Sequence, residues 1–220
     1  MPEEHPKTWT HAETVSAGRP LTEEIARDHE TLRQCYENYK KATTDDEKQE
    51  WVNQYVWTNA RHAIAEEIVV YPIMDDLMGE EAKEITEKDR DSHQRIKEDL
   101  YAFQSKAVTD SDHADAFKQV FESLWQHVIP EETEDLPAFE KYLSEERSLE
   151  IAKQFRRSQY FTPTRSHPSA PRYTPYETAA GLMAAPIDKL MDLFRSFPSE
   201  EMMEEKITTG ANQPTHVYGE

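Results

Sequence analysis

The sequence predicts an all-α protein, an up-down-up-down four-helix bundle with additional C-terminal helices. Two observations carry this prediction. Only 5 of the 220 residues are glycine, and long stretches are rich in the helix-forming residues Glu, Lys, Ala, Gln and Leu. Apolar residues also recur at helical spacing in four consecutive segments, and no stretch shows the alternation typical of a strand. The length fits one domain with extensions.

The four bundle helices can be placed in order. They are expected at about residues 21–42, 46–74 and 80–108, with a fourth running through Val128. Residues 43–46 close the first helix and cap the second, and residues 109–112 cap the fourth. Pro72 is expected to bend the last turn of the second helix. Short turns between the helices make neighbouring helices antiparallel.

Composition divides the chain into four parts. They are an N-terminal arm (1–20), the bundle (21–141), a C-terminal extension (142–198) and a disordered acidic tail (199–220). A charged segment over 140–159, expected to be helical, leads from the bundle into the extension. An extended connection with four prolines then covers 160–176, and an amphipathic helix covers 182–197. We expect the apolar stripe of that helix to dock on the bundle, because such stripes usually face a core. A helix that binds a protein partner is the alternative.

Charge and cysteine content exclude several classes of protein. With 25 basic and 44 acidic residues the net charge is −19, which opposes binding to nucleic acid or to an anionic membrane. The apolar runs are too short to span a bilayer, and the start of the chain has no signal region, so we expect a cytoplasmic protein. Cys35 alone forms neither an internal disulfide nor a thiolate cage. Any metal site must therefore use nitrogen and oxygen ligands.

Four of the nine histidines lie in the middle of predicted helices among apolar residues. His62 follows His29 by 33 residues, and His127 follows His93 by 34. The segments that begin at the second histidine of each pair both have the pattern H-x-x-x-E-E-x-x-x-x-P, which ends at Pro72 in one and Pro137 in the other. The chain thus contains a two-fold internal repeat.

Helix geometry gives this repeat a chemical meaning. Each turn lies about midway between successive histidines, so antiparallel helices bring all four to one layer. Glu66 and Glu131 follow their histidines by four residues, on the same helix face one turn on. Buried carboxylates need a counter-charge, which favours a metal pair over an accidental polar layer. The histidines outside this layer are expected to have no metal role: His5, His11, His113, His167 and His216.

The candidate ions are iron, manganese and zinc. Two histidines per ion and two bridging carboxylates give each ion about four protein donors, which would satisfy zinc. Iron or manganese prefers about six, which leaves positions for dioxygen, peroxide or nitric oxide. Comparable open sites in four-helix bundles hold di-iron or di-manganese centres.

These residues resemble the hemerythrin-like, or HHE cation-binding, domain over about 21–141. The resemblance rests on Asp28-His29-Glu30, on His62 with Glu66, on His93, and on His127 with Glu131. It implies a four-helix bundle with a non-haem di-iron centre. The four histidines would be terminal ligands, and the two glutamates would be bridging carboxylates.

Two positions differ from the oxygen-carrying members of that family. Those members have a further histidine where this chain has Lys97, and a charged lysine cannot bind a metal. They also use the carboxylate that corresponds to Glu132, whereas the more widespread domain uses Glu131. We choose Glu131 because it repeats the spacing of His62 and Glu66.

The missing histidine leaves one iron more open, which argues against reversible oxygen carriage. We expect a di-iron protein that binds or senses dioxygen, peroxide or nitric oxide, or handles iron, with weak oxidase or peroxidase-like turnover as one mode. Whether it is an enzyme stays open. The alternatives are an interaction module that zinc or iron only stabilises, and a metal-free helical scaffold. The C-terminal extension is the expected contact for a protein partner.

Overall fold

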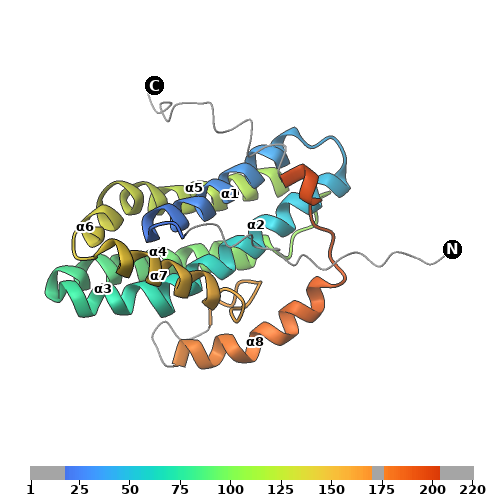
Figure 1. Ribbon diagram of the computed structural model, residues 1–220. Coiled ribbons are helices and arrows are strands. Elements are labelled where there is room, and N and C mark those ends of the chain that lie inside the picture. The colour runs from blue at the N-terminus through green and yellow to red at the C-terminus, as the bar shows by residue number, and fades with distance from the viewer. Residues whose placement is uncertain (1–17, 170–175, 204–220) are drawn as a thin grey trace, which may run out of the picture.

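The computed structural model describes residues 18–169 and 176–203, and it confirms the all-α bundle (Figure 1). The described residues contain no strand. The bundle helices are α1 (Leu21–Lys41), α2 (Asp45–Ala65), α3 (Tyr71–Met78), α4 (Glu80–Phe103), α5 (His113–Pro130) and α6 (Leu136–Glu140). Two π-helical segments, η1 (Glu66–Val70) and η2 (Glu131–Asp135), join α2 to α3 and α5 to α6. Beyond the bundle lie α7 (Glu145–Ser158) and α8 (Tyr176–Asp192).

Side-chain caps fix the starts of two helices, whereas Asp112, in the cap expected for the fourth bundle helix, makes no side-chain bond to the start of α5. Thr44 and Glu47 form a capping box at the start of α2, and Ser144 caps α7, so that side chains satisfy backbone N–H groups at both starts. The third bundle helix ends at Phe103, short of the predicted 108. The residues that follow form turns, in which the Asp110 carboxylate accepts the N–H of Ala107.

The second bundle helix differs from its prediction. It ends at Met78, within the turn expected near residues 75–79, but a π-helical segment begins at Glu66, before the bend expected at Pro72. The N–H of Tyr71 bonds to the carbonyl of Glu66, five residues back, which is the π spacing. A proline follows the first residue after each π segment. Proline has no backbone N–H to donate. It is therefore tolerated directly after a π segment, where the regular pattern of helical hydrogen bonds is already interrupted.

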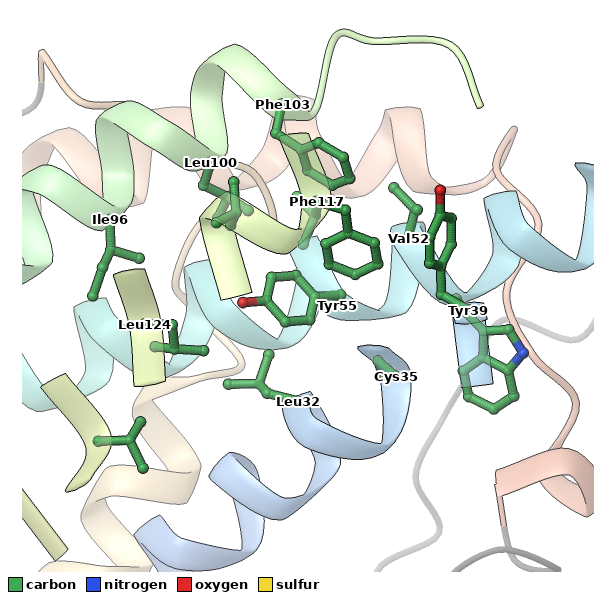
Figure 2. Packing of buried hydrophobic residues seen from close by; sticks show 14 of the residues in the cluster. Leu32, Cys35, Tyr39, Val52, Tyr55, Ile96, Leu100, Phe103, Phe117 and Leu124 are labelled. Carbon is green, nitrogen blue, oxygen red and sulfur yellow. The ribbon is translucent and has the colours of Figure 1, made fainter. Parts of the chain in front are cut away.

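Two apolar clusters fill the bundle. One contains Tyr55, Leu100 and Phe117 (Figure 2), and the other contains Ile25 and Met74. The two clusters lie towards opposite ends of the bundle. The mid-helix histidine of each long helix lies between these two ends. The polar layer is therefore enclosed by apolar side chains, which keep it dry.

The predicted docking of the apolar stripe in the C-terminal helix is wrong. α8 begins earlier and ends earlier than expected, and among its described side chains Ala185 and the polar Asp188 are buried. That carboxylate accepts the N–H groups of Thr164 and Arg165 and contacts His167. These bonds fix the rotation of the helix and leave four stripe residues between 47% and 81% exposed: Ile187, Leu190, Met191 and Phe194. The side chain of Met183 lies outside the described residues, and Phe197 is half-buried.

The predicted disorder from residue 199 is also wrong at its start. Residues 200–203 are helical, and Met203 is 9% exposed and packs on the cluster of Figure 2. Met202, beside it, packs against the same cluster. Residues 204–220 of the tail and 1–17 of the arm lie outside the described residues. None of the described helices is long and apolar enough to cross a membrane.

Candidate metal centre

Four histidines, one from each long helix, meet in the middle of the bundle. His29, His62, His93 and His127 come from α1, α2, α4 and α5, and each is at most 4% exposed. The Nε2 atoms of His29 and His62 lie 3.0 Å apart, and those of His93 and His127 lie 2.9 Å apart. The structure therefore brings together all four histidines that the spacing singled out, as two pairs.

Two buried glutamates link these pairs. Glu66 is 0% and Glu131 is 2% exposed. Glu66 Oε2 lies 3.4 Å from Nε2 of His62 and 3.4 Å from Nε2 of His93. Glu131 Oε2 faces the other histidine of each pair, at 3.4 Å and 3.6 Å. Each carboxylate thus faces one histidine of each pair, which is the arrangement a bridging ligand needs.

The donor atoms form two groups that could each hold an ion. Within each group the ligand atoms lie within 4.8 Å of one another. The first group has four members, His29, His62, Glu66 and Glu131, and the second has three, Glu66, His93 and His127. All six residues predicted from the sequence are included, and the shared glutamate joins the two groups.

A second layer of carboxylates surrounds the histidines. The Nδ1 atom of every ring faces one of them, and such partners orient metal-binding histidines and fix their tautomer. Nδ1 of His29 donates to Glu132 at 2.7 Å, and Nδ1 of His62 donates to Asp28 at 3.3 Å. Nδ1 of His93 donates to Glu67 at 2.9 Å. Nδ1 of His127 lies 3.6 Å from Asp89.

This layer determines what the Nε2 atoms can do. A neutral imidazole that donates from Nδ1 carries only a lone pair at Nε2. His29 and His62 both donate from Nδ1, so their Nε2 lone pairs face each other at 3.0 Å. Two such lone pairs repel. Two nitrogens about 2.1 Å from one ion, at right angles, would be roughly 3 Å apart, so a cation fits this spacing and removes the repulsion.

The glutamates need a cation as well. Among the described residues, no donor bonds to either side-chain oxygen of Glu66 or to Oε2 of Glu131, and buried oxygens without partners are rare in native structures. Burial and the neighbouring Glu131 carboxylate raise the pKa of Glu66 well above its usual range. Burial lowers the pKa of His29 to about 3 and that of His93 to about 4. The imidazoles of His29 and His93 are therefore neutral at pH 7 and available as ligands.

The π-helical segments position the glutamates. Each begins at the first glutamate of the E-E pair. In η1 both Glu66 and Glu67 are buried, at 0% and 1% exposed, although neighbouring residues of a regular helix point about 100° apart. The first of them faces the centre and the second bonds to His93. A π turn at a functional site is a recurrent device of this kind.

Lys97 lies beside the centre and not in it. Its Nζ donates to Glu67 Oε2 at 2.5 Å, and Glu67 Oε1 in turn accepts the Nδ1 proton of His93. The lysine is 8% exposed. It therefore acts on the centre through Glu67, whose carboxylate lets the chain accommodate a cation at this buried position.

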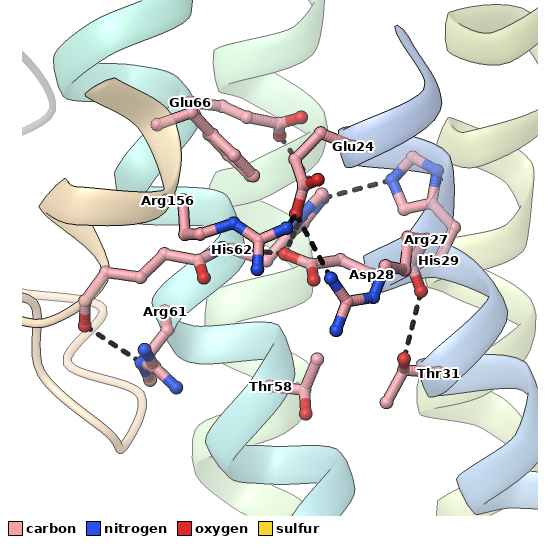
Figure 3. A network of polar contacts seen from close by, with 12 residues as sticks. Glu24, Arg27, Asp28, His29, Thr31, Thr58, Arg61, His62, Glu66 and Arg156 are labelled. Atoms are coloured by element: carbon pink, nitrogen blue, oxygen red, sulfur yellow. Dashed lines mark hydrogen bonds and ion pairs between the residues drawn. The ribbon is translucent and has the colours of Figure 1, made fainter. Parts of the chain in front are cut away.

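Helix α7 covers the side of the centre at His62 (Figure 3). The ring of Phe155 meets that of His62 edge-on at 5.9 Å, and Arg156 forms an ion pair with Glu24 on α1. Gln159, just after α7, donates to Asp28 at 2.6 Å. The extension thus excludes water from the His62 ring and holds its Nδ1 partner.

Sequence reasoning missed this second layer. The repeat of two consecutive glutamates was a signal for Glu67 and Glu132, whose roles match in the two halves. Asp28 and Asp89 had no such signal, because their histidine partners lie on other helices 34 and 38 residues away. His113 and His167 lie outside the centre, where they contact Tyr39 and Asp188.

Comparisons with known proteins agree with this geometry. A family model described as the hemerythrin HHE cation-binding domain matches residues 21–139. A protein of Schizosaccharomyces pombe named as hemerythrin-like is 49% identical over 178 residues, which cover 81% of this chain and 88% of that protein. A search of solved structures gave no significant match.

Proposed function

Because the chain belongs to the hemerythrin HHE cation-binding family, we propose that it holds two iron ions and uses them to bind dioxygen, peroxide or nitric oxide. His29 and His62 would hold one ion and His93 and His127 the other. Glu66 and Glu131 would lie between the two ions. When bound, iron supplies Lewis acidity and one-electron redox chemistry. Manganese and zinc are the alternative ions.

The facing Nε2 atoms carry this proposal. Their spacing of 3.0 Å and 2.9 Å suits two ligands of one ion, and between His29 and His62 it is unfavourable for two lone pairs with nothing between them. The unbonded oxygens of Glu66 and Glu131 support the same conclusion. With two histidines and shared carboxylates, each ion keeps positions open for a small ligand.

The chain's own residues prepare the site for that chemistry. The Nδ1 partners hold the rings in the orientation a ligand needs. The apolar clusters at either end of the bundle and Phe155 on α7 keep water away from the imidazoles. A role in sensing these ligands or in handling iron is part of the proposal. The cytoplasmic location stays a prediction from the sequence.

A metal-stabilised interaction module without redox turnover is the second candidate. The exposed apolar side chains of α8, such as Ile187 at 67% exposed, favour a protein partner for the extension. In that case zinc or iron would only hold the bundle together.

Redox behaviour separates the two candidates. Protein loaded with ferrous iron without oxygen should change its visible absorption when air or peroxide is admitted, and the ferrous form should bind nitric oxide. Zinc-loaded protein is the control and should show neither change. If the iron-loaded protein is equally inert, the redox proposal is wrong and the interaction module is favoured.

A further inference from the structure

The hydroxyl of Tyr71 points at the nitrogen of His93 that would hold an ion. Its Oη lies 3.3 Å from Nε2 of His93, and the two ring centroids are 5.6 Å apart. Tyr71 is 1% exposed. Two ligands at right angles on one ion, each about 2.1 Å from it, would be roughly 3 Å apart. The position of Oη therefore suits a ligand of the same ion as His93.

The two ion positions differ in their supply of donors. Four donor groups lie close together around His29 and His62, whereas around His93 and His127 three do, because Glu131 contacts His127 at 3.6 Å without joining that group. Lys97, on the face of α4 that carries His93, does not fill the gap because its Nζ is bonded to Glu67. The position that lacks a donor is the one beside Tyr71.

The internal repeat breaks at this tyrosine. In the first half, Tyr71 precedes Pro72, and in the second half Leu136 precedes Pro137. The chain thus carries a hydroxyl beside the three-donor group, at a position where the second copy of the repeat carries an apolar side chain. Packing alone would be served by leucine at both positions.

Metal binding would also deprive this hydroxyl of its partner. Within the described part of the chain, the hydroxyl of Tyr71 has one hydrogen-bond partner, Nε2 of His93. Since Nδ1 of His93 donates to Glu67, Nε2 accepts the phenolic proton. An ion that takes this lone pair would leave a buried hydroxyl without an acceptor, which is costly, unless the oxygen turns to the ion.

We propose that Tyr71 is an oxygen ligand of the ion held by His93 and His127. This inference rests on the proposed function, because it requires iron at that position. On coordination the phenolic O–H bond breaks, a bond from oxygen to iron forms, and the proton leaves to solvent. No oxidation state changes in this step.

Resonance Raman spectroscopy of the ferric protein tests this directly. Phenolate bound to ferric iron gives a charge-transfer band in the visible region, and excitation in that band enhances phenolate ring vibrations. We expect these vibrations in the wild-type protein, their shift when the protein contains ring-deuterated tyrosine, and their loss in Tyr71→Phe. Tyr55→Phe is the matched control, because Tyr55 is equally buried but belongs to the apolar cluster of Figure 2, and it should keep them.

Iron content, measured on the same samples, separates the possible failures. Wild-type protein with two irons and no phenolate vibrations would overturn the Tyr71 assignment and leave the di-iron proposal standing. Wild-type protein that takes up no iron would overturn both. Because the wild-type spectrum alone decides the first case, the test does not depend on whether Tyr71→Phe folds.

Discussion

Glu67 accepts the Nδ1 proton of His93 across 2.9 Å, one residue after Glu66 turns its carboxylate to the centre. The second half of the repeat divides its glutamates in the same way, since Glu132 accepts from His29. The two glutamates of each pair therefore have different roles. The first faces the ion positions, and the second orients a histidine on a different helix.

This division predicts the effect of changing a second glutamate. Glu132→Gln should weaken metal binding by about 10- to 100-fold, because the amide no longer provides the negative partner that fixes the His29 ring. Competition with a metal-binding dye would measure the change. Glu134→Gln, in the same π segment but on its exposed side, should leave the affinity unchanged. Equal effects of the two variants would mean that Glu132 acts only through surface charge.

Lys97 should matter for stability because its ion pair is buried. Lys97→Met should lower the free energy of unfolding by roughly 3 kcal/mol, since it removes a positive partner from the buried Glu67. Urea unfolding would measure this loss. The matched control is Lys88→Met, also on α4, because Lys88 pairs with Asp135 while half exposed. That change should cost less than about 1 kcal/mol, and a similar cost for both would contradict this role of Lys97.

Stability of the metal-free protein should depend on pH through the histidines. Burial lowers the pKa of His29 to about 3 and of His93 to about 4, from 6.5. The unfolded chain therefore binds protons below pH 6.5 that the folded chain does not bind. This contribution to stability is complete above pH 6.5 and is lost as the pH falls toward 4, by at most about 1.4 kcal/mol per pH unit for each histidine.

The pKa shifts of Glu66 and His127 have the opposite effect on the pH dependence of stability. Burial and Glu131 raise the pKa of Glu66 above its usual 4.5, so its contribution is lost as the pH rises above 4.5. For His127, burial is outweighed by Glu131 and Asp89, and its raised pKa makes its contribution fall above pH 6.5. Between pH 4.5 and pH 6.5, the loss of stability with falling pH from His29 and His93 is larger than the gain from the Glu66 carboxyl. Urea unfolding in chelator should therefore show maximal stability near pH 6.5, and a steady rise from pH 5 to 8 would contradict it.

Removal of a histidine should remove the stabilisation that metal provides. At a metal concentration 100-fold above the dissociation constant, binding adds about 2.7 kcal/mol to the free energy of unfolding. Thermal unfolding of His62→Ala or His127→Ala should therefore respond much less to added chelator than that of the wild type. His113→Gln changes a buried histidine that bonds to Tyr39, and it should keep the full response. Variants at His62 and His127 that respond like the wild type would support a metal-free scaffold.

The helix layout and the inner residues of the centre were accessible from the sequence. Because the rise per residue of a helix is constant, the number of residues between each histidine and the nearest turn sets the height of that histidine in the bundle. The four-residue spacing places Glu66 on the same helix face as His62. In the outer layer, the positions of Asp28 and Lys97 were not accessible, because these residues meet partners on other helices. The identity of those partners depends on how the helices are rotated about their axes.

The C-terminal helix shows the same limit. Its apolar stripe predicted a docked face, yet the hydrogen bonds of Asp188 to Thr164 and Arg165 set its rotation. An apolar pattern indicates a preferred face, but a buried carboxylate with backbone partners can outweigh it, since leaving that carboxylate without donors would cost more.

Metal content of the full-length protein, purified without added metal, tests the central claim most directly. Elemental analysis should find two iron atoms per chain, and the content should fall in His29→Ala and His93→Ala, one from each pair. Stoichiometric zinc without iron, or no stoichiometric metal in protein that is folded, would contradict the di-iron account.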